Sequence, residues 1–316
     1  MEHATIQGLE SEHVELEEVA GGVVAALARR GGGALSNGAI VDLGDRTLLF
    51  DAFITPQAAG DVRAAAERLL GRPVAFAVNS HWHLDHVGGN RALDATTVIV
   101  ATTGTRELVA TAGAEQLGRL KAVDGPAYLR ELAESVAAET DLERRRALEV
   151  ELAEARHVYA ALPGMVHRLP EQTFDERVTF HGSRRSAELL TWGGGHTGSD
   201  AFLWLPADRV LLAGDLVTVG CHPLLVHGDP AAWAGILDRL ADLDLAVVVP
   251  GHGKVGGADD VRAVRRYLDA LDALAAQDPG PDGAAGDGLP AELAGWEWPE
   301  QLARNLEFLR ARSRPA

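Results

Sequence analysis

The chain contains a single cysteine, Cys221, among its 316 residues. This scarcity excludes a disulfide framework within the chain and a metal site made of cysteines alone. The sequence also lacks any run of eighteen apolar residues, so no segment is predicted to cross a membrane as a helix. Residues 1–18 are rich in glutamate and lack the apolar segment of a secretory signal peptide. We therefore expect a cytoplasmic protein.

Positive charge is also scarce. Lys and Arg total 29 against 46 Asp and Glu, which gives a formal net charge of -17. Such a surface repels phosphate groups, so we expect neither a nucleic-acid partner nor attachment to an anionic membrane. Solubility alone is a sufficient reason for the acidity. Apolar residues make up 47% of the chain, which is enough for a sizeable core.

Strand and helix patterns alternate over the first hundred residues. Apolar or alternating segments predict strands at 13–19, 22–28, 38–43, 46–51, 74–78 and 97–101. A helix is predicted at 56–70, with Pro56 near its start and Gly71 just past its end. The glycine-rich run 29–37 predicts a mobile loop.

Residues 104–162 have a different composition, rich in Ala, Leu, Glu and Arg, and predict helices at 127–138 and 141–161. We interpret this stretch as a helical insertion that serves packing or dimerisation, or forms a wall over a site. Strands resume at 178–181, 187–192, 201–205, 209–213 and 245–249, with helices at 229–240, 258–275 and 298–312. We therefore expect a two-halved domain over 1–276, followed by a linker and a C-terminal helix over 277–316.

The candidate chemistry begins where the predicted strand 74–78 ends. The following segment, NSHWHLDHVGGN, holds three histidines and an aspartate within six residues: His81, His83, Asp85 and His86. Imidazole and carboxylate are typical ligands of zinc and its neighbours. Residues two apart on an extended chain project to the same side, so His81 and His83 can reach one ion. A lone histidine is more often structural, but this spacing strongly favours a metal site.

Three further candidates each lie where a predicted strand meets a glycine-rich turn. His196 follows strand 187–192 within GGGHTG, Asp215 follows 209–213 within AGD, and His252 follows 245–249 within PGHG. Strand ends are rigid, and glycine lets a ligand approach closely. Each residue alone is as often structural as functional. Together they indicate one site.

The series H-x-H-x-D-H, G-H-T, G-D and G-H-G resembles that of the metallo-β-lactamase superfamily over roughly Val14 to Val261, apart from the insertion. The resemblance implies an α/β fold, the αββα sandwich, in which two mixed sheets pack together between outer helices. It implies a first metal ion on His81, His83 and His196. A second ion would bind Asp85, His86 and His252, with Asp215 bridging both. The expected cofactor is two zinc ions, with iron or manganese as alternatives. Asp51, at a strand end, either orients a ligand histidine or is a turn residue.

This resemblance implies a metal-dependent hydrolase that acts on a small ester, lactone, thioester or β-lactam-like amide. Paired cations lower the pKa of a shared water from 15.7 to around 7, which creates a nucleophile at neutral pH. Asp85 is the expected catalytic carboxylate, orienting the nucleophile or passing a proton to the leaving group. The expected partner is a small-molecule substrate, with Trp82, His222 and His227 as candidate contacts. A core or solvated-loop role is the alternative for each of the three.

Other activities and the oligomeric state stay open. A mononuclear iron dioxygenase acting on persulfides has the same ligand motifs, and a phosphodiesterase also suits a two-metal centre. A non-catalytic relative would lack ligands, and none is missing here. Cys221 lies where the family pattern requires no ligand, so we expect a small buried or pocket-edge residue rather than a metal ligand. The insertion helices or the apolar tail 296–310 offer a homodimer contact, although packing back on the parent domain is the simpler explanation for the tail.

Overall fold

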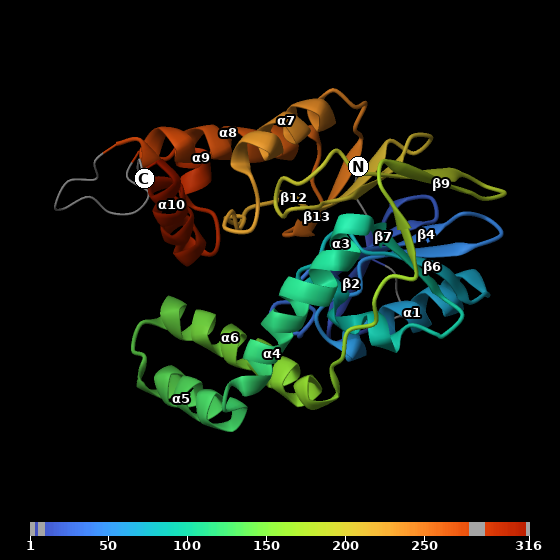
Figure 1. Cartoon of the computed structure of the whole chain (residues 1–316). Helices are drawn as coiled ribbons and strands as arrows, with labels where there is room; N and C mark the ends of the chain where they lie inside the picture. The colour runs from blue at the N-terminus through green and yellow to red at the C-terminus, as the bar shows by residue number, and fades with distance from the viewer. Residues whose placement is uncertain (1–3, 6–9, 278–287, 314–316) are drawn as a thin grey trace.

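The computed structural model describes residues 4–5, 10–277 and 288–313, in which two mixed β-sheets pack face to face (Figure 1). The larger sheet runs in chain order through β1 (Ala4–Thr5), β2 (Val14–Ala20), β3 (Val23–Ala28), β4 (Gly38–Asp42), β5 (Thr47–Phe50), β6 (Val74–Val78), β7 (Val98–Thr102) and β8 (Gln172–Phe174). The smaller has the order β13 (Val247–His252), β12 (Val210–Thr218), β11 (Phe202–Leu205), β10 (Ser186–Leu190) and β9 (Arg177–His181). Most of the predicted linker, residues 278–287, lies outside the described residues.

The direction of the strands places several chain segments at one edge of the sandwich. Strands β5 to β8 run parallel in the first sheet, and β12 runs parallel to β13 in the second. Parallel strands end at the same edge of a sheet, so the segments that follow them meet there. Strand β12 extends to Thr218, past the predicted end at 213. Asp215 therefore lies within this strand, where its register with β13 is irregular.

The helices cover the outer faces and form the insertion. They are α1 (Pro56–Leu70), α2 (Leu84–Val87), α3 (Thr103–Leu108), α4 (Ala114–Ala122), α5 (Gly125–Ala138), α6 (Leu142–Ala161), α7 (Pro230–Ala241), α8 (Ala258–Ala275), α9 (Ala291–Ala294) and α10 (Pro299–Ser313). The bounds of α1 confirm the predicted helix at 56–70. Thr55 caps its start, and Gly71 closes its end in the left-handed conformation with φ 66°.

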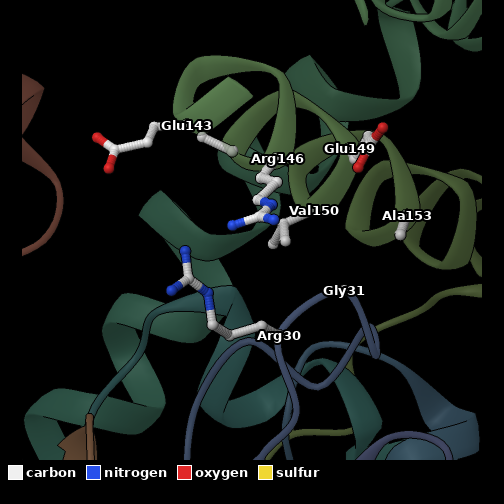
Figure 2. Close-up of a pocket in the computed structure, with 8 residues that line it drawn as sticks. Arg30, Gly31, Glu143, Arg146, Glu149, Val150 and Ala153 are labelled. Atoms are coloured by element: carbon white, nitrogen blue, oxygen red, sulfur yellow. The ribbon is translucent and has the colours of Figure 1, made fainter. Parts of the chain in front are cut away.

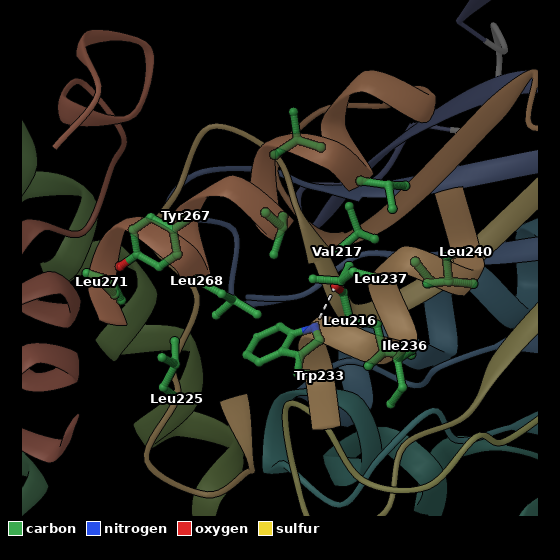
Figure 3. Packing of buried hydrophobic residues seen from close by; sticks show 14 of the residues in the cluster. Leu216, Val217, Leu225, Trp233, Ile236, Leu237, Leu240, Tyr267, Leu268 and Leu271 are labelled. Atoms are coloured by element: carbon green, nitrogen blue, oxygen red, sulfur yellow. Dashed lines mark hydrogen bonds between the residues drawn. The ribbon is translucent and has the colours of Figure 1, made fainter. Parts of the chain in front are cut away.

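Three buried apolar clusters separate the layers and confirm the αββα arrangement. One lies between the sheets, and a second lies between the larger sheet and α1. The third packs the smaller sheet against α7, α8 and α10 around Trp233 (Figure 3). Trp233 is fully buried, and its Nε1 donates a hydrogen bond to the carbonyl of Leu216 at 3.0 Å. The polar atom of this large ring is therefore satisfied inside the core.

The insertion contains the two predicted helices, now α5 and α6, which pair and project from the sandwich (Figure 1). Helix α6 docks on the glycine-rich loop predicted to be mobile. The carboxylate of Glu154 accepts hydrogen bonds from the backbone N–H of Gly31 at 2.7 Å and of Gly33 at 2.6 Å. The loop is therefore anchored to the insertion.

The C-terminal helix α10 packs back on the parent domain through Leu302, Leu306 and Leu309. Its buried Asn305 side chain donates to the carbonyl of Pro223 at 2.6 Å and accepts from the N–H of Leu225 at 3.0 Å. The tail thus holds the segment that follows β12. Among the described residues, no helix combines the length and apolar character needed to span a bilayer.

Candidate metal centre

The structure brings together all seven side chains that the sequence singled out as ligands. They come from five segments: the loop after β6, helix α2, the turn after β10, strand β12 and the end of β13. They form two groups, and within each group all ligand atoms lie within 4.8 Å of one another. The first group is His81, His83, His196 and Asp215, and the second is Asp85, His86 and His252.

Distances within the cluster fit two adjacent sites. In the first group, Nδ1 of His83 lies 3.0 Å from Nε2 of His81 and 3.0 Å from Nε2 of His196. In the second, Oδ2 of Asp85 lies 3.4 Å from Nε2 of His86 and 3.3 Å from Nε2 of His252. Each set of donor atoms therefore converges on one point, as ligands of a single ion do.

The Asp215 carboxylate contacts both groups. Its Oδ2 lies 3.3 Å from Nε2 of His196 and 3.3 Å from Nε2 of His252, and its Oδ1 lies 3.1 Å from Nε2 of His86. A carboxylate in this position can place one oxygen toward each group. This geometry suits the bridging role that the family resemblance implies.

Most of the histidine rings are oriented through their other nitrogen. Nδ1 of His81 lies 2.9 Å from Oγ of Ser80, which donates to Asp51, and Nδ1 of His86 lies 2.8 Å from Asp51 itself. The fully buried Asp51 therefore supports both ligand histidines, as one of the two sequence interpretations proposed. These contacts leave Nε2 of each ring directed into the cluster, the arrangement common around bound metals.

The two remaining oriented rings use different partners. Nδ1 of His252 donates to the carbonyl of Leu35 at 3.2 Å, and Nε2 of His83 lies 2.8 Å from Nδ1 of His227. His227 is thus an orienting neighbour of His83, in addition to lining the pocket. The sequence offered no signal for this contact, which joins residues 144 positions apart.

The polar atoms of the cluster do not satisfy one another. Nε2 of His86 and Oδ1 of Asp215 are buried and close, yet neither has a hydrogen-bond partner. Buried polar atoms without partners are rare and costly in folded proteins. A cation between these atoms would satisfy both, so the residues present fit a bound metal.

The cluster is also strongly polarised. Burial alone would raise the pKa of the Asp215 carboxyl, but His252, His86 and His196 outweigh burial and hold this pKa well below its usual range. Conversely, burial and the neighbouring imidazoles lower the pKa of His81 and His83 well below normal. The ionised Asp215 and the neutral His81 and His83 have the protonation states that metal binding requires. Despite burial, the carboxylates of Asp215 and Asp85 raise the pKa of His86 and His252 above normal, so these two rings must lose a proton when a metal binds.

Two residues outside the motif series hold the ligand turns in place. The buried carboxylate of Asp200 accepts from the backbone N–H of Gly195 at 2.7 Å and of Thr197 at 2.9 Å, on either side of His196. Asp51 adopts φ 60°, an uncommon conformation for a residue with a side chain. Sequence reasoning missed Asp200. Its position at the end of the turn GGGHTGSD, a typical site for an aspartate that accepts backbone N–H groups, was the available signal.

The centre forms the floor of a pocket of about 320 Å³. The lining includes the ligands His83, Asp85, His196, Asp215 and His252, together with Leu35, Gln116, Thr218, His222, Pro223, Leu224, His227, Trp298, Glu300 and Gln301.

Of the predicted substrate contacts, His222 and His227 line the pocket. Trp82 does not: it is buried behind His83, with ring centroids 4.6 Å apart, and packs with Val87 and Val109. Cys221 is buried, and burial raises the pKa of its thiol to about 12.

The tail contributes one wall of this pocket, which the sequence did not predict. Trp298 has φ 64° and lies with its ring centroid 5.1 Å from that of His252. Glu300 and Gln301, in the first turn of α10, line the same wall. The apolar bulk of the tail predicted its packing but gave no information on which surface it covers.

Comparisons with known proteins agree with this geometry. The family described as the metallo-beta-lactamase superfamily matches residues 31–252. A type 2 metallo-beta-lactamase from Bacteroides fragilis is 27% identical over 105 residues, which are 32% of this chain and 42% of that relative. The matched part thus spans less than half the length of this curated relative.

Solved structures share the fold. A metallo-beta-lactamase from Pontibacter korlensis superposes with a TM-score of 0.54 at 20% identity, covering 85% of this chain and 98% of that one. A second, from Hirschia baltica, has a TM-score of 0.57 at 16% identity, covering 81% of this chain and 98% of its own. At these identities the similarity establishes the αββα architecture alone.

The packing around Asp215 yields a first testable prediction. A Cβ at Gly251 would overlap Oδ1 of Asp215 and lie 2.7 Å from the carbonyl carbon of Gly214. We expect Gly251→Ala to displace the carboxylate, to lose most bound metal and to destabilise the protein by about 1–3 kcal/mol. Metal analysis and thermal unfolding measure both effects.

The matched control is Gly235→Ala on α7, where an added Cβ meets no atom within 4 Å. Alanine is the better helix former by up to about 1 kcal/mol, so this control should be neutral or slightly stabilising. Normal metal content in Gly251→Ala would show that the position of Asp215 is not restricted in this way.

Proposed function

The chain belongs to the metallo-β-lactamase superfamily, and on that basis we propose that it is a metal-dependent hydrolase of a small acyl substrate. The proposed substrate is an ester, lactone, thioester or β-lactam-like amide. One observation carries the proposal: two sets of ligand atoms flank the Asp215 carboxylate on the floor of an accessible pocket. This arrangement supports a pair of metal ions that both face a bound substrate.

We propose zinc for both positions because imidazole and carboxylate ligands suit this ion. His81, His83 and His196 would hold the first ion, and Asp85, His86 and His252 the second, with Asp215 shared. When bound, such a pair supplies an activated water and polarises the substrate carbonyl. The remaining chemistry belongs to residues of this chain.

Asp85 is the carboxylate best placed to handle protons. Its side chain is 22% exposed, against 7% for Asp215 and none for Asp51. Ser36 donates a hydrogen bond to the Asp85 carbonyl and so fixes the backbone that carries it. Burial would raise the pKa of the Asp85 carboxyl, but His86 and His252 hold it well below its usual range, so the group is ionised at neutral pH. In this state it orients a nucleophilic water and accepts its proton.

The pocket walls support an apolar acyl group. Leu35, Leu224 and the ring of Trp298 provide apolar surface near the second group of ligands, while His222 provides a buried imidazole. Nδ1 of His222 is buried without a hydrogen-bond partner, and its ring packs near Tyr267 with centroids 5.3 Å apart. The pocket therefore combines an apolar wall with polar groups that can orient a substrate.

Metal analysis combined with a substrate panel tests the proposal. We expect about two zinc ions in the candidate metal centre, hydrolysis of at least one lactone, thioester, ester or β-lactam, loss of turnover with chelator, and recovery when zinc returns. Bound iron with persulfide-dependent oxygen consumption would instead indicate the dioxygenase. Turnover restricted to phosphodiesters would indicate a phosphodiesterase. Either result contradicts the proposed function.

Changing Asp85 tests its role in proton transfer. We expect Asp85→Asn to reduce kcat on the order of 10²- to 10⁴-fold, because the amide cannot accept the proton of the attacking water. It should also weaken the second metal position. The control is Asp259→Asn, whose side chain is 98% exposed. Normal turnover in Asp85→Asn at full metal content would exclude this role.

Shortening Trp298 tests the apolar wall. We expect Trp298→Ala to raise KM for an apolar acyl substrate roughly 10-fold, since losing the contact of this exposed ring with the substrate is worth about 1.4 kcal/mol. Metal content and kcat should change little. The control Leu142→Ala removes an apolar side chain that is 65% exposed and does not line the pocket. Equal KM values in the two variants would show that Trp298 does not contact the substrate.

A further inference from the structure

Outside the candidate metal centre, the described residues include another compact group of possible ligands: Glu12, His13 and His157. Their ligand atoms lie within 4.8 Å of one another. Glu12 and His13 stand just before β2, whereas His157 lies on α6 of the insertion. The group therefore joins the β-sandwich to the helical insertion across 144 positions of sequence.

The His13 ring is held as a metal ligand would be. It is 4% exposed, and its Nδ1 donates a hydrogen bond to the carbonyl of Gly32. With the proton on Nδ1, the lone pair is on Nε2, which lies 3.8 Å from Oε1 of Glu12. A backbone carbonyl that orients the second ring nitrogen is the usual support of a metal-bound histidine.

The His157 ring is placed against His13 by close packing of α6 on the loop. The two ring centroids lie 5.2 Å apart in an edge-to-face arrangement. A Cβ at Gly33 would overlap Cβ of His157, so the loop tolerates only glycine beneath this helix. Figure 2 shows the same approach one turn earlier, where Gly31 faces Val150 and Ala153 of α6.

The surroundings favour a cation. Glu154, on the same helix, lies near His157, and its carboxylate accepts from Gly31 and Gly33. Tetrahedral coordination with bonds of about 2.0–2.1 Å places adjacent ligand atoms roughly 3.3 Å apart. The observed separation of 3.8 Å between His13 and Glu12 closes with a small movement of the Glu12 side chain, which is 73% exposed.

We propose that Glu12, His13 and His157 bind a divalent transition-metal ion, zinc by preference, with solvent completing the coordination. The ion fixes the insertion helix α6 to the loop that starts at Gly31. The chemistry of the ligands excludes calcium and magnesium, which prefer sites made entirely of oxygen.

This site has a structural connection to the catalytic pocket. The loop that Glu154 and His13 hold continues to Leu35, whose carbonyl accepts from Nδ1 of His252, and to Ser36, which donates to the carbonyl of Asp85. Fixing the start of the loop therefore restrains the two contacts that orient ligands of the second group. Zinc at the outer site should order both the helix and this loop.

The experiment compares His157→Ala with the control His181→Ala. His181 lies on β9, and its side chain forms a hydrogen bond with Ser186. Equilibrium dialysis against zinc counts bound ions, and hydrogen exchange follows residues 142–161 and 31–37. We expect wild type and His181→Ala to bind one ion more than His157→Ala. In wild type and in His181→Ala, added zinc should slow hydrogen exchange in the two segments. Removing a ligand should weaken the binding of this ion at least roughly 100-fold.

Glu12→Gln provides a second variant at an exposed position. It should weaken the binding of the same ion without affecting folding. The expected difference between variants does not depend on how many ions the candidate metal centre holds, so failure of the proposed hydrolase activity would leave this test intact. Identical zinc stoichiometry, affinity and exchange in His157→Ala, Glu12→Gln and the control would overturn the proposal.

Discussion

The buried carboxylate of Asp215 is the constraint on which the rest of the site depends. It lies between two groups of imidazole and carboxylate ligands, and it can do so only because β12 loses its regular register with β13 at Gly214 and because Gly251 leaves room for its oxygen. Such a dense cluster of unsatisfied polar atoms is unfavourable on its own. A bound cation converts the same cluster into a favourable one, since it gives every donor atom a partner.

Support for this cluster comes from groups that are not themselves candidate ligands. Asp51 orients two histidines, Asp200 holds the turn around His196, and the carbonyl of Leu35 orients His252. The rings of His81, His83, His86 and His252 thus have one nitrogen committed to the protein and the other directed inward. The αββα sandwich makes this possible because its parallel strands end at a common edge, where the turns that carry the ligands lie side by side.

The shape of the pocket, by contrast, is set by segments added to the sandwich. The insertion contributes Gln116, and the C-terminal tail contributes Trp298 and Glu300. The glycine-rich loop on which α6 docks connects the insertion to the second group of ligands. The candidate ligands and the added walls therefore reside in different parts of the chain, with the ligands at the edge of the sandwich and Gln116, Trp298 and Glu300 on peripheral segments.

The sequence by itself determined the bounds of α1 and α8 and the seven candidate ligands, because periodicity and motif spacing are local properties. The αββα fold followed from the resemblance of its motif series to a known family. Only the tertiary structure decided that Trp82 is buried behind His83 rather than on the pocket wall, that His227 contacts His83, and that the tail covers the pocket. Each of these facts depends on contacts between residues far apart in the chain. Such contacts follow from how the layers pack, and no local pattern records them.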